Sequence, residues 1–203
     1  RNTDTIERVS VSSLGVEGDG NSTTPSISSD GRYVSFESFA TNLVAGDANT
    51  FRDIFVYDRN TDTIERVSVS SLGVEGNGGS GGPSISSDGR YVSFESSSTN
   101  LVAGDTNAAS DIFVYDRNTD TIERVSVSSL GVEGNNVSVS PYISSNGSYV
   151  SFDSLATNLV PGGSSGIYIY DRNTDTIEQI GGSISSISSD GRYVSFESSS
   201  TNL

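Results

Sequence analysis

Histidine, cysteine, methionine, tryptophan and lysine are all absent from this 203-residue sequence. Without histidine or cysteine, neither a Ser-His-Asp nor a Cys-His nucleophilic system can be assembled, and zinc, copper and haem sites lose their usual ligands. Without lysine, a Walker phosphate-binding loop cannot exist. Without cysteine, folding needs no oxidising compartment. These absences exclude the commonest types of catalytic site.

The charge is strongly one-sided. The 26 acidic residues outnumber 11 basic residues, all of them arginine, and the formal net charge is −15. Such a surface repels nucleic acid and anionic membranes, so we expect no nucleic-acid partner. No apolar run approaches the roughly 20 residues that cross a bilayer, so we expect no membrane insertion. Cations are the natural partners, unless the acids only solvate the surface.

The sequence consists of one repeated unit. The units cover 1–58, 59–116, 117–171 and 172–203, and the first two differ at only ten positions. Apolar residues in each unit are mostly Ile, Val, Phe and Tyr, which suit pleated strands. The chain opens inside a repeat, because residues 1–11 correspond to the last strand of a blade. We expect it to be a processed or excised piece.

Four strand-like segments recur in each unit. In the second unit they are expected at 83–87, 90–96, 111–116 and 121–127. The second segment alternates polar and apolar residues, whereas the third is apolar on both faces, as expected for a sheet packed between two others. An Asp-Gly or Asn-Gly pair follows the first segment, at 30–31, 88–89, 146–147 and 190–191. We interpret it as a two-residue hairpin turn with positive φ at both positions.

A four-stranded sheet of this length has little core of its own and becomes stable by packing on copies of itself. The sequence therefore predicts an all-β protein, a single β-propeller of four-stranded antiparallel blades over 1–203. Three full blades are expected at about 25–69, 83–127 and 141–180, and a composite, incomplete fourth from 183–203 with 1–11. Three arrangements remain open: a compact four-bladed ring, two chains completing one larger ring as a homo-oligomer, or a fragment of a longer propeller.

The segment Pro-Ser-Ile-Ser-Ser-Asp-Gly-Arg-Tyr-Val-Ser-Phe-Glu-Ser resembles the blade signature of the TolB-type or WD40-like (PD40) propeller repeats, in a highly repetitive bacterial form. It recurs at 25–38, 83–96, 141–154 and, without its proline, 185–198. The resemblance implies a propeller fold and a family composed mostly of interaction modules. It also implies an extracytoplasmic location, periplasmic or secreted. It is specific for the fold and not for function.

One pattern of hard oxygen ligands stands out in the loop before the third strand. It places Asp47, Asn49 and Asp53 close together in the first unit, and Asp105, Asn107 and Asp111 in the second. Such a set suits half of a Ca²⁺ shell, and calcium is the one candidate cofactor. The alternative is an Asx-rich turn whose carboxylates accept loop N–H groups. In the third unit the loop at 161–166 lacks all three residues, which excludes a third site.

Carboxylates suited to glycosidase chemistry occupy one repeated position, at Glu37, Glu95, Asp153 and Glu197. Repetition in every unit favours a structural or surface role, and we expect no catalytic residue. The arginines of the fourth segment, Arg8, Arg66 and Arg124, are expected to make cross-strand pairs.

The leading functional hypothesis is a non-enzymatic scaffold or binding module that presents variable loops to a protein or glycan partner. Two alternatives stay open. One is a repetitive structural or designed self-assembling propeller without a specific ligand. The other is a propeller enzyme, a hydrolase or lyase that uses channel carboxylates.

Overall fold

A computed structural model describes residues 5–180, 183–188, 190–191 and 193–197. All regular elements in this part of the chain are β-strands, which confirms the all-β prediction. No helix there is long and apolar enough to cross a membrane. The strands are β1 (Ser22–Ile27), β2 (Tyr33–Ser38), β3 (Asp53–Asp58), β4 (Thr63–Arg66), β5 (Ser80–Ile85), β6 (Tyr91–Ser96), β7 (Asp111–Asp116), β8 (Thr121–Arg124), β9 (Ser138–Ile143), β10 (Tyr149–Ser154), β11 (Gly166–Asp171), β12 (Thr176–Ile180), β13 (Ser183–Ile187) and β14 (Val194–Glu197).

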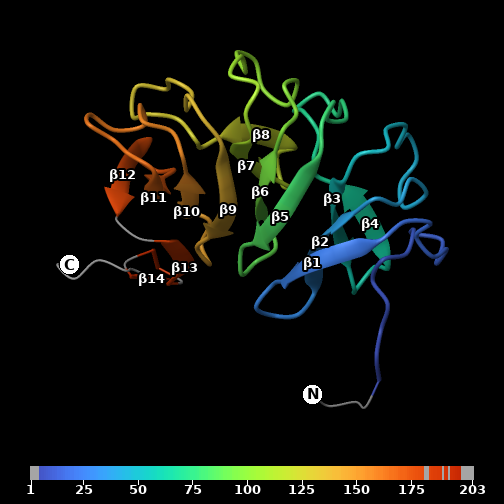
Figure 1. Cartoon of the computed structure of the whole chain (residues 1–203). Helices are drawn as coiled ribbons and strands as arrows, with labels where there is room; N and C mark the ends of the chain where they lie inside the picture. The colour runs from blue at the N-terminus through green and yellow to red at the C-terminus, as the bar shows by residue number, and fades with distance from the viewer. Residues whose placement is uncertain (1–4, 181–182, 189, 192, 198–203) are drawn as a thin grey trace.

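These strands form three four-stranded antiparallel sheets, β1–β4, β5–β8 and β9–β12, and a two-stranded sheet, β13–β14. In each sheet the spatial order follows the chain order, as in a propeller blade. Figure 1 shows the sheets side by side in a curved row. The three complete sheets begin at residues 22, 80 and 138, three residues before the expected starts. The proline of each repeat lies inside the first strand, at a bulge where the missing N–H costs no ladder bond.

The hydrophobic core lies between neighbouring sheets. All six residues of β3 and of β7 are buried, which confirms the prediction of strands packed on both faces. One core cluster combines Ile54 and Val56 of β3 with Val92 and Phe94 of β6, and the corresponding cluster joins the second and third sheets. Neighbouring sheets thus share two of the three core clusters, and the third, around Phe36 and Phe55, lies within the first sheet.

The N-terminal segment covers part of the outer face of the first sheet. Val9 and Val11 pack on the core cluster of that sheet, in the way that Val67 and Val69 pack on the next one. In Figure 1 this segment and the β13–β14 sheet lie at opposite ends of the row of sheets. Within the described residues, β13 and β14 pair only with each other. The composite fourth blade therefore stays a prediction.

The Asp-Gly turn differs from the expected two-residue hairpin. Only the glycine has positive φ, 73° at Gly31, and the loop is longer, with Gly31 N–H donating to the Ser28 carbonyl. The Asp30 carboxylate accepts hydrogen bonds from the Ser28 hydroxyl and the Arg32 N–H. The aspartate is an acceptor within the loop rather than a residue of special backbone conformation, so Asn146 serves equally well in the third unit.

One set of contacts joins each sheet to the next. The ring of Tyr33 in the first sheet lies against Gly89, in the Asp-Gly turn of the second, so closely that a Cβ on this glycine would approach Cδ2 nearer than 3.0 Å. The Arg117 guanidinium also stacks on this ring, 4.3 Å from its centroid. Arg117 also donates to the Gly89 carbonyl and to Glu65 of the first sheet. Glycine is needed here for close approach as well as for its φ.

The same contacts recur further along the row. Tyr91 lies against Gly147 with Arg172 stacked on it, and Tyr149 lies against Gly191. Arg172 donates to Glu123, as Arg117 does to Glu65. The junction between sheets is thus a repeated structure. One sheet supplies the tyrosine, which we call the donating side, and the following sheet supplies the turn glycine and the arginine, which we call the receiving side.

Candidate functional site

The positions that differ between the first two units gather at one end of the sheets. The first and third strands of each sheet begin at this end, and the second and fourth strands end there. We call it the loop end, because the long loops at 39–52 and 97–110 lie there, whereas the tight turns lie at the opposite end. The ten positions that differ between the first two units all fall at the loop end: 19, 21, 23, 24, 39, 40, 48, 50, 51 and 52.

In the first sheet the loop end carries aromatic and charged side chains. Phe39 and Phe51 are each about half exposed. The Arg52 guanidinium lies 5.9 Å from the Phe39 ring centroid and pairs with Glu37 at 3.0 Å. In the second unit serine stands in place of Phe39 and Arg52, and alanine in place of Phe51. The same backbone therefore presents a different surface from one sheet to the next.

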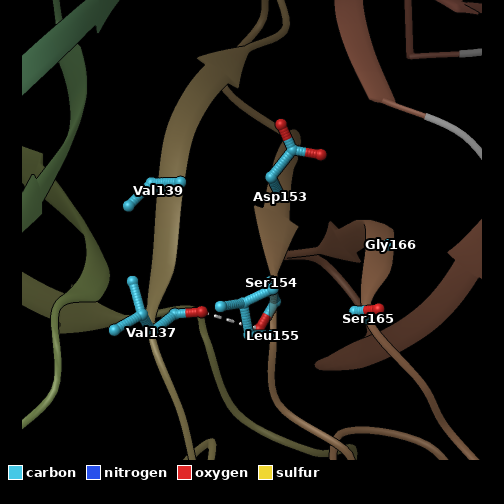
Figure 2. A pocket seen from close by; sticks show the side chains of 7 residues that line it. All are labelled: Val137, Val139, Asp153, Ser154, Leu155, Ser165 and Gly166. Carbon is cyan, nitrogen blue, oxygen red and sulfur yellow. Dashed lines mark hydrogen bonds between the residues drawn. The ribbon is translucent and has the colours of Figure 1, made fainter.

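In the third sheet the loop end is hollowed by a cavity of about 400 Å³. Figure 2 shows side chains from before and within β9 next to those at the end of β10, with Ser165 across from them. Val137, Val139 and Leu155 occupy variable positions of the repeat, where the second unit has glycine or serine. The lining residues are Val137, Val139, Asp153, Ser154, Leu155, Ser165 and Gly166. Variation among the units has produced an apolar hollow here.

A buried charge cluster lies beneath the loop end of the first sheet. The carboxylates of Asp47, Asp53 and Glu75 have oxygens within 4.8 Å of one another. Nη1 of Arg66 lies among them, 3.1 Å from Asp47, 3.5 Å from Asp53 and 2.8 Å from Glu75. Three carboxylates around one guanidinium leave two formal negative charges when all are ionised.

The second sheet repeats this cluster with Asp105, Asp111 and Glu133 around Arg124. Here Nη1 lies 2.8 Å from Glu133 but 3.6 Å from Asp105. The Asp105 side chain is 1% exposed, and neither of its oxygens has a hydrogen-bond partner within the described structure. A buried carboxylate without hydrogen bonds is costly, so burial favours the protonated form of Asp105.

Burial changes the proton affinity of these clusters. It raises the pKa of Asp47 to about 6, against the opposing effect of Arg66. It also raises the pKa of Asp53, Asp105 and Asp111. The pKa of Glu133 is lowered instead, mainly because the Thr106 hydroxyl donates to it. The second cluster thus combines two carboxyls whose pKa is raised with one, Glu133, whose pKa is lowered.

The two asparagines of the predicted ligand sets do not present oxygen to the clusters. Asn49 Oδ1 accepts the Phe51 N–H at 2.7 Å, and its amide nitrogen donates to Asp53 at 3.2 Å. Asn107 does the same, with Nδ2 donating to Asp111 at 3.1 Å. These bonds fit the Asx-turn alternative, because an amide N–H₂ is a donor and not a metal ligand.

The structure therefore brings Asp47 close to Asp53, and Asp105 close to Asp111, and turns the asparagine oxygens away. Sequence reasoning missed Glu75 and Glu133, which arrive from a later hairpin, and did not place Arg66 or Arg124 in the clusters. Calcium binding by these residues stays a prediction. Three carboxylates suit a hard divalent cation, but the guanidinium occupies the space between them.

The third unit lacks the acids and the arginine together. Gly166 stands where Asp53 and Asp111 stand in the first two units, and Gln179 where Arg66 and Arg124 stand. The Gln179 amide donates to the Ser164 carbonyl at 2.7 Å. Loss of the cation along with the anions indicates that the arginine is the counter-ion of the carboxylates.

The repeated carboxylates of the second strand bond to the next sheet. Glu37 Oε2 accepts the Gly82 N–H at 3.0 Å, and Glu95 Oε2 accepts the Ser140 N–H at 2.9 Å. Both donor residues, Gly82 and Ser140, have positive φ, in the bulge of the following first strand. Asp153 lines the cavity of the third sheet, and the side chain of Glu197 lies outside the described residues.

Comparison with known proteins supports the fold. No protein-family model and no curated protein matches the sequence. Among solved structures, TolB from Acinetobacter baumannii superposes with a TM-score of 0.54 at 20% identity, over 89% of this chain and 38% of that one. A protein described as TolB from Agrobacterium tumefaciens gives 0.51 at 19%, over 78% and 48%.

The β-propeller domain of the Trilobed protease from Pyrococcus furiosus, which has an open velcro topology, gives a TM-score of 0.51 at 14% identity, over 79% of this chain and 41% of that one. The chain thus spans less than half the length of each of these structures. The likeness shows that the chain has a TolB-like β-propeller fold, and at these identities it shows the fold alone.

Proposed function

We propose that this chain is a non-enzymatic binding module that recognises a protein partner through the loop end of its sheets. The observation that carries the proposal is the position of the ten differences between the first two units, all at that end. The strands of the two units are nearly identical, whereas the side chains at the loop end differ. A constant scaffold therefore carries a variable surface.

The chemistry of the variable surface favours a protein over a glycan. Phe39, Phe51 and Arg52 gather at the first sheet, and an apolar hollow beside Leu155 lies at the third. Partly exposed aromatic, arginine and aliphatic side chains are the groups that supply most binding energy at protein interfaces.

The buried clusters support this surface. Arg66 donates to the carbonyl of Gly46, and Asn49 donates to the carbonyl of Gly76, so both loops are fastened to the sheet. A loop held in one conformation loses less entropy when it binds. We infer that the clusters pre-organise the recognition loops.

The enzymatic alternative has less support. Glu37 accepts hydrogen bonds from Thr23, Arg52 and Gly82, which together lower its pKa although burial opposes them. A carboxylate engaged with three donors holds two sheets together and is poorly placed to exchange protons with a substrate.

The chain itself offers a test of the proposal. A variant with Phe39→Ser, Phe51→Ala and Arg52→Ser carries at the first sheet the residues that the second sheet already tolerates, so its fold should be preserved. Peptide ligands would be selected from a phage-displayed library on the wild type. Their affinity for the triple variant would then be measured, with Asn60→Ala, at the opposite end of the sheet, as the control.

We expect the selected peptides to bind the wild type and the control and to bind the triple variant at least tenfold more weakly. Peptides that bind all three equally would contradict a loop-end site. Enrichment on a glycan array, with none in the peptide library, would replace the protein partner by a glycan. The extracytoplasmic location stays a prediction, tested by fractionation of the source cells.

A further inference from the structure

The first sheet exposes a surface that is covered in the sheets that follow. Ile27 of β1 is 58% exposed, whereas Ile85 and Ile143, at the same position of β5 and β9, are each 7% exposed. The difference arises because β5 and β9 are packed against a preceding sheet. The exposed face of β1 is therefore built to the same pattern as two faces that are buried.

The receiving side of the inter-sheet junction is already assembled at this face. Arg59 donates to the Gly31 carbonyl at 2.7 Å and to Glu7 at 2.8 Å. Arg117 makes the same two bonds, to Gly89 and Glu65, and there the guanidinium stacks on Tyr33. At Gly31 the nearest atom to a Cβ would be Arg59 Nη1, at 3.7 Å. Space for a tyrosine ring is present on this glycine.

The donating side of the junction is exposed at the opposite end of the row. Tyr193, just before β14, corresponds to Tyr33, Tyr91 and Tyr149, which lie against the turn glycines of the following sheets. Tyr193 is 70% exposed. The described surface thus carries one tyrosine without a following sheet and one prepared glycine–arginine site without a preceding sheet.

We propose that two copies of this chain associate head to tail through these surfaces. Tyr193 of one copy lies on Gly31 of the second, beneath the Arg59 guanidinium, and covers Ile27. The occupant is a second copy because the chain builds this tyrosine–glycine contact three times within itself, twice with a stacked arginine. Figure 1 shows the two surfaces at opposite ends of the curved row. Two such junctions join two chains into one ring.

Electrostatics sets the conditions for this association. Each copy carries a net charge of −15, so the copies repel one another at low ionic strength. The junction itself consists of apolar packing and a cation–π contact, which salt weakens much less than it screens the long-range repulsion. We therefore expect the dimer fraction to rise with salt concentration.

The test uses one substitution at each surface. Tyr193→Ala removes the donating ring, and Ile27→Lys places a charge on the receiving face, the device that natural edge strands use against pairing. Leu72→Lys, at a loop residue that is 90% exposed, is the control for the added charge. Sedimentation equilibrium should give twice the chain mass for the wild type and the control, and the monomer mass for each of the two variants.

Mixing the two variants decides the geometry. The Tyr193→Ala chain keeps its receiving face and the Ile27→Lys chain keeps its tyrosine, so a head-to-tail junction predicts a one-to-one heterodimer in native mass spectrometry. A mixture that stays monomeric would overturn the proposal, as would a wild type that stays monomeric in high salt. Circular dichroism of each variant checks its fold. Peptide binding at the loop end is a separate readout, so failure here leaves the proposed function standing.

Discussion

The ring of Tyr33 fills the space where a side chain on Gly89 would lie. This one relationship couples two repeat units, since the tyrosine belongs to the first sheet and the glycine to the turn of the second. It explains why the turn needs glycine in a way that the local chain alone does not.

The coupling predicts unequal effects for two identical substitutions. Gly89→Ala should destabilise the chain by about 2–4 kcal/mol, because it adds a clash with Tyr33 to the cost of positive φ. Gly31→Ala has the same φ of 73° and no ring beside it, so it should cost only about 1 kcal/mol. Urea unfolding of the monomeric Tyr193→Ala background measures both. Equal losses would show that the ring is displaced without cost.

The raised pKa of Asp47, about 6, predicts a pH dependence of stability. The folded chain holds this proton more tightly than the unfolded chain, where an aspartate titrates near about 3.9. The stabilising contribution is therefore complete below pH 4 and is lost as pH rises through 6, by about 3 kcal/mol at most.

Asp47→Asn should remove that dependence, so the variant should gain on the wild type between pH 4 and 6.5. Urea unfolding across this range measures the gain, with exposed Glu178→Gln as the control. A difference that does not change with pH would mean that Arg66 neutralises the carboxyl fully.

Asp58 predicts the opposite dependence in a lower window. Arg32 donates two hydrogen bonds to it, at 2.9 and 2.7 Å, and holds its pKa at about 2. A lowered pKa stabilises the fold above pH 4, and this contribution is lost as pH falls towards 2. Arg32→Ser, which places at this position the residue found at Ser148, should destabilise the fold at pH 5 and destabilise it less at pH 2, because Asp58 is partly protonated at the lower pH. Carboxyl NMR titration of Asp58 gives the pKa directly.

The charge clusters predict a competition between arginine and calcium. Any Ca²⁺ bound by Asp47, Asp53 and Glu75 must displace Arg66 Nη1 from between them. Arg66→Gln leaves three carboxylates without their counter-ion, so millimolar Ca²⁺ should raise its melting temperature well above the shift seen in the wild type. Arg52→Gln, outside the cluster, is the control. Equal shifts in the Arg66→Gln variant and the wild type would show that the arginine does not occupy the cation position.

The candidate site could be predicted from the sequence only where its residues are close along the chain. Asp47 and Asp53 lie in one loop, and their proximity follows from its length. Arg66 lies on β4, and the alternation of side chains along this strand points it towards the two aspartates. Glu75 lies in the hairpin that follows β4. The positions of both residues therefore depend on how β3 pairs with β4. The direction of the Asn49 amide is also local, since Oδ1 accepts the N–H of Phe51 two residues on, and it fits the Asx-turn alternative.

The sequence by itself determined the repeat, the all-β class and the propeller blade, because period, strand alternation and turn glycines are properties of local chain order. The tertiary structure decided what each repeated residue does. Tyr33, Glu37 and Arg117 act on the neighbouring sheet, and such contacts depend on packing between units rather than on position within one. The turn glycine that suggested a hairpin proved to be half of the junction that holds the sheets together.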